Sequence, residues 1–68
     1  MSDHVYKKIE MTGSSTTGIE DAVQTALQKA GNSVRNMRWF EVSEIRGHIE
    51  DNKVAHWQGS LKVGFDVE

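Results

Sequence analysis

The feature that most constrains the fold is a single apolar stripe at helical spacing in the first half of the chain. Between residues 19 and 30 the apolar side chains recur at intervals of three and four residues: Ile19, Ala22, Val23, Ala26, Leu27 and Ala30. This spacing predicts one amphipathic α-helix whose apolar face must be covered by other parts of the chain. Thr17 and Glu20 are spaced for a capping box at its start, and Gly31 fits a left-handed C-cap at its end.

The segments around this helix are patterned as β-strands, at about residues 4–11, 34–50 and 54–67, with polar breaks between them. The alternation is clearest in the last segment, where one face carries Ala55, Trp57, Leu61, Val63, Phe65 and Val67. The order is therefore β-α-β-β, with the helix as a crossover between the first two strands. If the last strand lies between them, the result is an α+β fold: a three-stranded antiparallel sheet of order 1-3-2 packed on one helix.

The long third segment changes phase in its middle. Phe40 and Val42 mark even positions as core-facing, whereas Ile45 and Ile49 mark odd positions. One extra residue near Ser43–Glu44 would reconcile the two halves, so we expect a β-bulge there. The side chains then expected on the sheet face away from the helix are Met37, Trp39, Glu44, Arg46 and His48 from this strand, with His56, Gln58 and Ser60 from the last.

A turn with an odd number of residues keeps core-facing side chains opposite one another, and residues 51–53 would supply it. Beyond the bulge Trp39 then falls opposite Gly64, roughly 20 Å from Gln58 at about 3.4 Å per residue. A site that uses both Trp39 and Gln58 would therefore need two neighbouring subunits. The same register gives three further opposed pairs: His48 with His56, Arg46 with Gln58, and Glu44 with Ser60.

Trp39 has two interpretations on an uncovered sheet face. It is either buried in an interface between subunits or exposed as a stacking platform for a planar ligand. Its polar neighbours on that face are either simply solvated or serve to orient such a ligand. Three aromatic side chains on the opposite face are expected in the core: Phe40, Trp57 and Phe65.

No motif indicates catalysis or a metal centre. The chain has no marked nucleophile–base pair, phosphate loop or glycine-rich dinucleotide fingerprint. His48 and His56 face each other in the predicted register, but no third ligand stands at a convincing spacing, so we expect no metal site. The sequence therefore does not predict an enzyme.

Composition favours one small domain, residues 1–68, that associates with itself. A chain near this length buries only roughly 60% of its unfolded surface, and without cysteine it cannot form disulfides, so oligomerisation is the remaining common stabiliser. A net charge of −2 argues against nucleic acid as a partner. No apolar run approaches a membrane span or a signal peptide, so we expect no membrane partner and a reduced, cytoplasmic setting.

Nearly the whole chain carries motifs in a specific order and spacing: VYKKIE at 5–10, GSS at 13–15, RWFEV at 38–42, RGHI at 46–49, AHWQ at 55–58 and LKVGF at 61–65. In these motifs the chain resembles the bacterial dodecins. The resemblance implies a hollow homododecamer of cubic symmetry that binds flavin noncovalently. It further implies that the shell stores flavin and protects it from light, and that it is not an enzyme.

The resemblance also implies site residues. Trp39 matches the family's stacking tryptophan, so that pairs of isoalloxazine rings would lie between Trp39 side chains of symmetry-related subunits. Gln58 matches the flavin-binding glutamine. The remaining candidates match positions that line or border the site: Glu44, Arg46 and His48. The flavin would be FMN, riboflavin or FAD.

Two positions depart from the family pattern. Gly59 stands where a β-branched residue is common, and we expect it to loosen packing beside the site. Asp66 stands where many bacterial members carry arginine. Because an acid repels phosphate, Asp66 weakens the case for coenzyme A, which some bacterial members bind at another site. Two alternatives to flavin storage stay open: an oligomeric interaction module without flavin, and a small flavoenzyme.

Overall fold

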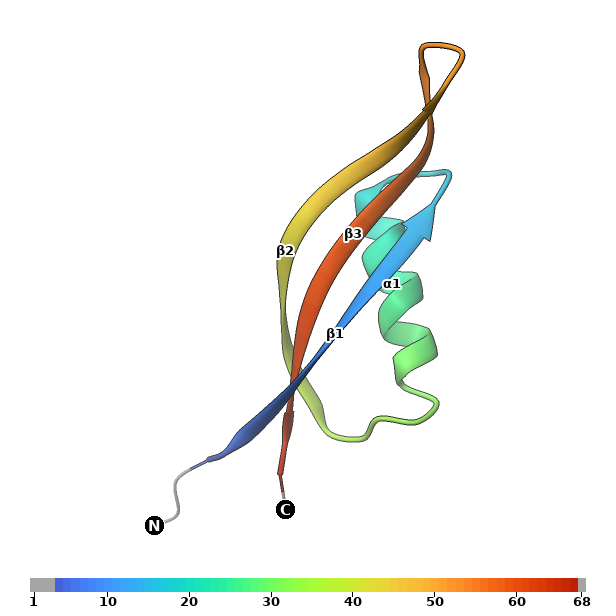
Figure 1. Ribbon diagram of the computed structural model, residues 1–68. Helices are drawn as coiled ribbons and strands as arrows, with labels where there is room; N and C mark the ends of the chain where they lie inside the picture. Colours follow the sequence, from blue (N-terminus) through green and yellow to red (C-terminus); the bar gives the residue numbers. More distant parts are fainter. Residues whose placement is uncertain (1–3, 68) are drawn as a thin grey trace.

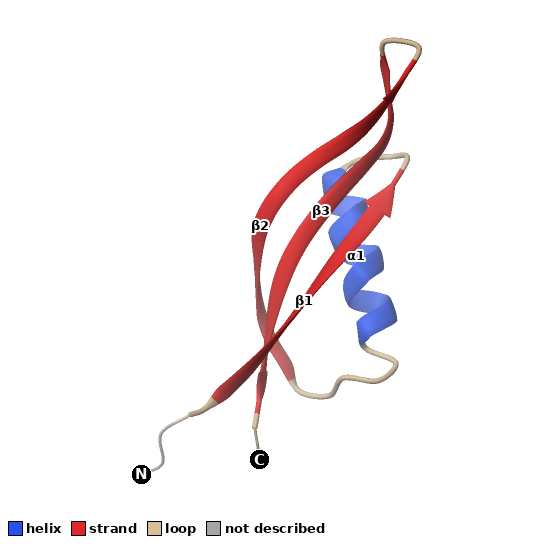
Figure 2. Ribbon diagram, in the orientation of Figure 1, coloured by secondary structure: helices blue, strands red, loops and turns tan. Residues whose placement is uncertain are grey.

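The computed structural model describes residues 4–67. It contains a strand β1 (Tyr6–Ser15), a helix α1 (Ile19–Ala30) and two longer strands, β2 (Met37–Glu50) and β3 (Lys53–Asp66). β3 lies between β1 and β2 and runs antiparallel to both, so the predicted fold and the sheet order 1-3-2 are confirmed. The helix lies on one face of the sheet, where it packs on β1 and β3, and the β2–β3 hairpin extends well past it (Figure 1; Figure 2).

The core lies between the middle of β3 and helix α1. Leu61 and Val63 are fully buried there and pack in one cluster with Ala26. A Cβ on Gly13 would overlap the carbonyl oxygen of Ala22 and lie 3.0 Å from the Cβ of Ala26. The missing side chain at Gly13 therefore lets the helix rest directly on β1. No helix in the described part of the chain is long and apolar enough to cross a membrane.

β1 continues to Ser15, so the prediction that this strand ends near Met11 is wrong. Thr12 pairs with Ser60 in β3, and their hydroxyl groups form a hydrogen bond of 3.0 Å. Polar residues are accommodated in this strand because one face of an antiparallel sheet can remain open to water. The other two strands shift slightly from their predicted ranges, to Met37–Glu50 and Lys53–Asp66.

The helix has the predicted extent, but the residues at its two ends do not cap it in the predicted way. Gly18 is the N-cap residue and no side chain caps it, so the predicted Thr17 capping box does not form. Instead the Ser15 hydroxyl accepts hydrogen bonds from the backbone N–H groups of Thr17 (2.9 Å) and Gly18 (3.4 Å) and donates one to Asp21 (2.7 Å). Gly31 keeps a right-handed φ of −62°, so the predicted left-handed C-cap is also wrong.

The β2–β3 register was predicted correctly for a partly wrong reason. The predicted bulge is present, because Ser43 is the extra residue between the pairs at Val42 and Glu44. The hairpin loop has two residues, Asp51 and Asn52, with φ of 52° and 63°, as a type I′ turn requires. The expected three-residue loop is thus absent. Ala55 is a second extra residue, this time on β3, and it restores the predicted pairing from His48 and His56 onward.

Strand alternation identified the face of the aromatic residues but not their burial. Phe40 and Trp57 were expected in the core, yet in the subunit they are 50% and 36% exposed, and Phe65 is half-buried. At Phe40 the reason is position, because α1 packs on β1 and β3 and leaves β2 uncovered even where its partner Val63 is buried. Toward the hairpin tip the reason is length, because a 12-residue helix spans about 18 Å whereas a 14-residue strand reaches about 48 Å. The hairpin therefore leaves further apolar side chains uncovered: Val42, Ile45, Ile49 and Val54.

Candidate functional site

The predicted site residues share the sheet face away from α1, which we call the open face. On β3 the odd-numbered side chains point to the helix: Leu61 and Val63 are buried there, and a Cβ on Gly59 would lie 3.4 Å from Ile19 Cδ1. Gln58 and the other even-numbered residues of β3 from His56 onward therefore face the opposite way. Pairing with β3 places four residues of β2 on the same open face: Trp39, Glu44, Arg46 and His48.

Trp39 lies at one end of the open face and is 38% exposed. It is paired with Gly64, and a Cβ built on Gly64 would overlap indole atoms Cε2 and Cζ2 and lie 2.8 Å from Cδ2. These relative positions put the glycine beneath the face of the indole rather than at its edge. The ring of Tyr6 meets the indole at 68°, with 6.0 Å between ring centroids. Trp39 is thus an exposed but supported aromatic surface.

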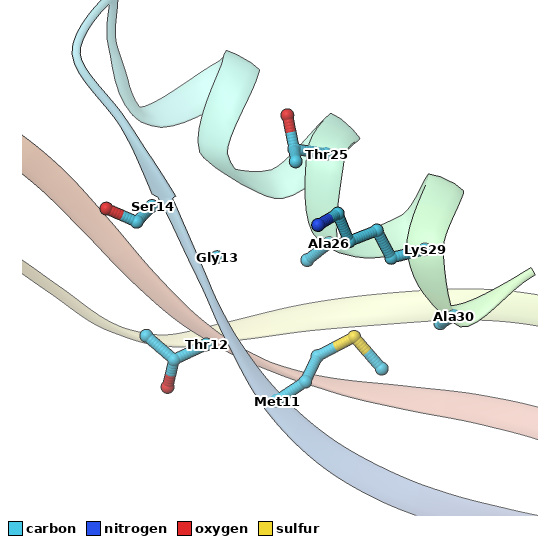
Figure 3. A pocket seen from close by; sticks show the side chains of 8 residues that line it. All are labelled: Met11, Thr12, Gly13, Ser14, Thr25, Ala26, Lys29 and Ala30. Atoms are coloured by element: carbon cyan, nitrogen blue, oxygen red, sulfur yellow. The ribbon is translucent and has the colours of Figure 1, made fainter.

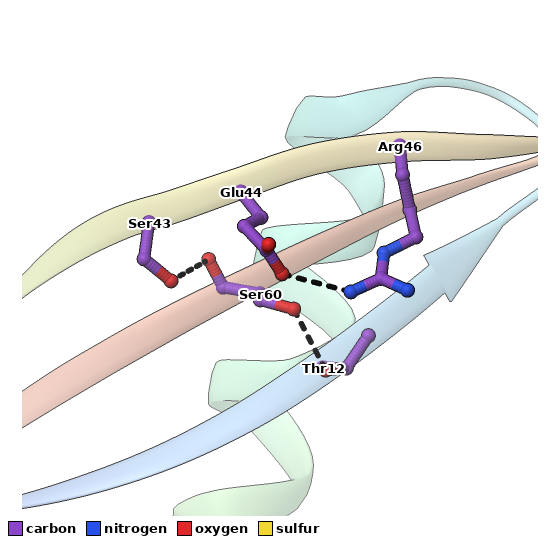
Figure 4. A network of polar contacts seen from close by, with 5 residues as sticks. All are labelled: Thr12, Ser43, Glu44, Arg46 and Ser60. Atoms are coloured by element: carbon purple, nitrogen blue, oxygen red, sulfur yellow. Dashed lines mark hydrogen bonds and ion pairs between the residues drawn. The ribbon is translucent and has the colours of Figure 1, made fainter.

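The middle of the open face is polar. Arg46 is the direct partner of Gln58 across the two strands, and its Nη2 lies 2.8 Å from Oε1 of Glu44 (Figure 4). Nearby, the Ser43 hydroxyl donates a 3.2 Å hydrogen bond to the carbonyl oxygen of Ser60. The side chains of Arg46 and Glu44 are mostly exposed, so this ion pair is weak and can be exchanged for contacts with a ligand.

The two histidines meet near the hairpin tip. The rings of His48 and His56 are 6.3 Å apart between centroids and tilted by 44°, as the predicted register required. His48 Nε2 also lies 3.7 Å from Oε2 of Glu50. Among residues 4–67 no group of three or more histidine and acidic side chains is placed to hold a metal ion.

Trp39 and the polar group lie at separate places on one subunit. The partner of Trp39 is Gly64, which stands six residues along β3 from Gln58, or roughly 20 Å at about 3.4 Å per residue. The predicted pairing is confirmed, and with it the conclusion that Trp39 and Gln58 of one chain cannot grip the same small molecule. Two subunits placed open face to open face could combine the aromatic surface of one with the polar group of the other.

A hollow of about 450 Å³ lies elsewhere, between β1 and the second half of α1 (Figure 3). It is lined by the residues of β1 around Gly13 and by helix residues such as Lys29. None of the predicted site residues lines it. This hollow and the predicted site are therefore different places.

Sequence reasoning overlooked two residues that shape the surroundings of Trp39. The first is Gly64. The predicted register places it opposite Trp39, but the register alone does not show that the missing side chain lets the indole pack on the glycine. The second is Tyr6, which belongs to β1 and faces Trp39 across β3. The signal for Gly64 was present in the predicted β2–β3 register. Tyr6 pairs with Asp66, two residues from Gly64, and the sequence predicted no register between β1 and β3 that would have placed it there.

Comparison with known proteins agrees with this arrangement. The family model described as Dodecin matches residues 5–68. The chain belongs to the dodecin family. A curated dodecin from Thermus thermophilus is 48% identical over 64 residues, which are 94% of this chain and 93% of the relative. The resemblance inferred from the motifs is therefore confirmed.

Solved dodecin structures confirm the fold. The dodecin from Streptomyces coelicolor superposes with a TM-score of 0.93 at 47% identity, covering 100% of this chain and 97% of that one. The dodecin from Streptomyces davaonensis gives a TM-score of 0.92 at 37% identity, with 98% of each chain covered. The β-α-β-β subunit with its long hairpin is thus the dodecin architecture.

The two departures from the family pattern have clear structural settings. Asp66 is largely buried for a carboxylate, with 20% of its side chain exposed, and its Oδ2 accepts a 2.8 Å hydrogen bond from Nε of Arg38. Gly59 faces the helix, and a Cβ there would make contacts of 3.4 Å with Ile19 and 3.6 Å with Val23. The expectation that Gly59 loosens packing thus concerns the helix side of the sheet and not the open face.

Proposed function

We propose that this dodecin-family chain binds flavin noncovalently, stores it and protects it from light within an oligomeric shell. The observation that carries the proposal is the Trp39 indole, which is exposed on the open face and supported from beneath by Gly64. A planar, electron-rich ring held in this way is suited to stack on a planar ligand. The flavin would be FMN, riboflavin or FAD.

The roles of the other site residues follow from their donors and acceptors. The Gln58 amide offers both a donor and an acceptor, as the pyrimidine edge of an isoalloxazine does. Arg46, Glu44 and His48 border that position on the same face and can contact the rest of the ligand. Because Trp39 and Gln58 of one subunit are far apart, each flavin would be held by two subunits. Pairs of isoalloxazine rings would lie between Trp39 side chains of symmetry-related chains.

Protection from light needs only the stacked indole. Trp39 can give one electron to an excited ring in van der Waals contact and take the same electron back, so the light energy ends as heat and no product forms. Such a cycle requires no nucleophile, no acid–base pair and no metal. We therefore propose that the protein is not an enzyme.

The uncovered apolar side chains support self-association. Ile45 and Ile49 on the hairpin are 62% and 70% exposed. An apolar groove of about 310 Å³ runs between α1 and β2, lined in part by Leu27, Phe40 and Val42. Exposed apolar surface of this extent is typical of an interaction surface. We propose that other copies of the chain cover it in a homododecamer, in a reduced, cytoplasmic setting consistent with the absence of cysteine.

Coenzyme A is not part of the proposal. Asp66 is already paired with Arg38 and adds a carboxylate where a phosphate ligand would need positive charge. The exposed apolar surface also suits an oligomeric interaction module without flavin, which is the second candidate function. The two candidates differ in a single property, the response of the assembled protein to flavin.

Titration decides between them. Riboflavin, FMN and FAD would each be titrated with the assembled apo protein while flavin fluorescence is followed, with oligomer size measured by light scattering. We expect saturable quenching near one flavin per chain, and loss of that quenching in a Trp39→Ala variant that still assembles. Undiminished fluorescence with correctly assembled wild-type protein would remove flavin binding and leave the interaction module. Turnover of a reductant by the loaded protein would instead favour a small flavoenzyme.

A further inference from the structure

The orientation of the Trp39 ring is set by its neighbours on β3 and β1. The indole covers Gly64 so closely that a side chain there would overlap two of its ring atoms. Gly64 is buried although it lies on the open face, because the ring itself covers it. One face of the indole is therefore packed on backbone, and the rest of the ring stays available.

Tyr6 completes the surroundings of the ring. Its own ring lies 6.0 Å from the indole and at 68° to it, which is the favourable edge-to-face geometry for two aromatic side chains. It comes from β1, so the indole reaches from β2 across β3 toward the first strand. Tyr6 thus limits the sideways movement of the ring, while Gly64 limits its height above the sheet.

We infer that Gly64 and Tyr6 are positioning residues that hold the Trp39 indole in one plane before any ligand arrives. We call this arrangement the Trp39 seat: Gly64 beneath the ring and Tyr6 beside it. The inference rests on the proposed function, in which the exposed part of Trp39 stacks on flavin. Neither Gly64 nor Tyr6 needs to touch the ligand for this role.

The physical reason is preorganisation. A tryptophan on an open sheet face has two rotatable side-chain bonds, and a ligand that needs one orientation must otherwise order them on binding. A methyl group at position 64 would lift or tilt the ring, and a misplacement of about 1 Å at a contact site can weaken function by a large factor. Removing Tyr6 would leave the ring in place on average but free to swing.

The test compares matched variants as assembled apo proteins, titrated with riboflavin because it carries no phosphate. Gly64→Ala should weaken riboflavin binding by about tenfold or more and leave the bound flavin partly fluorescent. Tyr6→Ala should weaken binding by roughly two- to tenfold, and Tyr6→Phe should restore it, because the edge contact needs the ring and not the hydroxyl. Gly59→Ala, on the same strand but facing the helix, should bind as the wild type does.

The residual fluorescence of bound flavin distinguishes positioning from general stability. A variant that is merely less stable still quenches fully once riboflavin is saturating, whereas a displaced indole does not. Wild-type affinity together with complete quenching in assembled Gly64→Ala would overturn the inference. So would a Tyr6→Phe variant that behaves like Tyr6→Ala.

A second measurement keeps the inference testable without flavin. Gly64→Ala should lower the unfolding midpoint of the wild type but not that of a Trp39→Ala chain, because the clash disappears with the ring. Additive effects of the two changes on the unfolding midpoint would overturn the inference. The midpoints can be compared even where Gly64→Ala does not assemble. If the wild type binds no flavin but the cycle shows coupling, the proposed function fails while the contact between Gly64 and Trp39 stands.

Discussion

Arg46 is the direct partner of Gln58 across the β2–β3 ladder, and Glu44 holds its guanidinium by an ion pair of 2.8 Å. The three side chains come together only because the bulge at Ser43 shifts Glu44 and Arg46 onto the open face. A cation beside an amide with both donor and acceptor is suited to a ligand with a polar ring edge and an anionic tail. The carboxylate of Glu44 then competes with that tail for Arg46.

Glu44→Gln should therefore change the choice among flavins. Losing the competing carboxylate should raise the affinity for FMN by up to about fivefold, or about 1 kcal/mol, while leaving riboflavin unaffected. Paired titrations with the two flavins at low and high salt measure this, and the gain should shrink at high salt. Glu41→Gln removes the same charge from the same face as a control. An equal change in both affinities would contradict the competition.

Gln58→Ala should weaken the binding of all three flavins alike. The amide contributes hydrogen bonds worth about 0.5–1.5 kcal/mol each, so affinity should fall by roughly tenfold. The bound flavin should remain quenched, because Trp39 is untouched. Gln28→Ala, at an exposed position of α1, is the matched control for loss of an amide. Unchanged affinity in Gln58→Ala would remove Gln58 from the site.

Ile49→Asp should prevent assembly. Ile49 is 70% exposed on the hairpin, so the change costs the subunit little, but burial of a carboxylate between subunits is strongly unfavourable. We expect a monomer or small oligomer by light scattering, with riboflavin binding lost at the same time because each site needs two subunits. Asn52→Asp adds the same charge at the exposed turn and should assemble normally. A full-sized Ile49→Asp assembly would show that the hairpin tip lies outside the interfaces.

Much of the fold and part of the site could be predicted from the sequence. The alternation in β3 and the phase change between Val42 and Ile45 predict the strand faces and the bulge. These follow from the two-residue period of strands, which is local. The pairing of Trp39 with Gly64 depended in addition on the length assumed for the hairpin turn, and the sheet order on the last strand lying between the other two. The same period assigns the open face correctly except at Met37, where the prediction is wrong: an irregularity beside Trp39 pairs Met37 with Phe65 and packs it against the core.

What could not be predicted depends on shape in three dimensions. Alternation assigns Trp57 and Phe40 to the helix side but cannot show which part of that side a single helix covers. The turn that leads into α1 depends on which hydroxyl reaches the backbone N–H groups of Thr17 and Gly18, and the longer β1 strand brings Ser15 there. The orientation of Trp39 depends on how closely its ring packs on Gly64, which their predicted pairing alone does not show.

The hydrogen bonds of Ser15 in the turn before α1 make a prediction about stability. Ser15→Ala removes the acceptor for two backbone N–H groups and a hydrogen bond to Asp21, and should lower the free energy of unfolding by about 1 kcal/mol. Thr17→Ala should change the free energy of unfolding by only a few tenths of a kcal/mol, because no side-chain hydrogen bond caps the start of α1. Denaturation of both variants under the same conditions checks this. A larger effect at Thr17 than at Ser15 would restore the capping box.

The two glycines that face the helix should respond oppositely to alanine. At Gly13 a Cβ would overlap the backbone carbonyl of Ala22, and because backbone cannot turn aside, Gly13→Ala should cost at least about 1–3 kcal/mol. At Gly59 a Cβ would meet only side-chain atoms of Ile19 and Val23, at 3.4 Å and beyond. Gly59→Ala should therefore stabilise the subunit, by about 0.5–1 kcal/mol, since glycine inside a strand loses more entropy on folding. Thermal unfolding of the two variants measures the contrast. Gly18→Ala serves as the reference, because a Cβ there has no neighbour within 4 Å. A destabilised Gly59→Ala would mean that α1 and β3 are already packed as closely as their side chains allow.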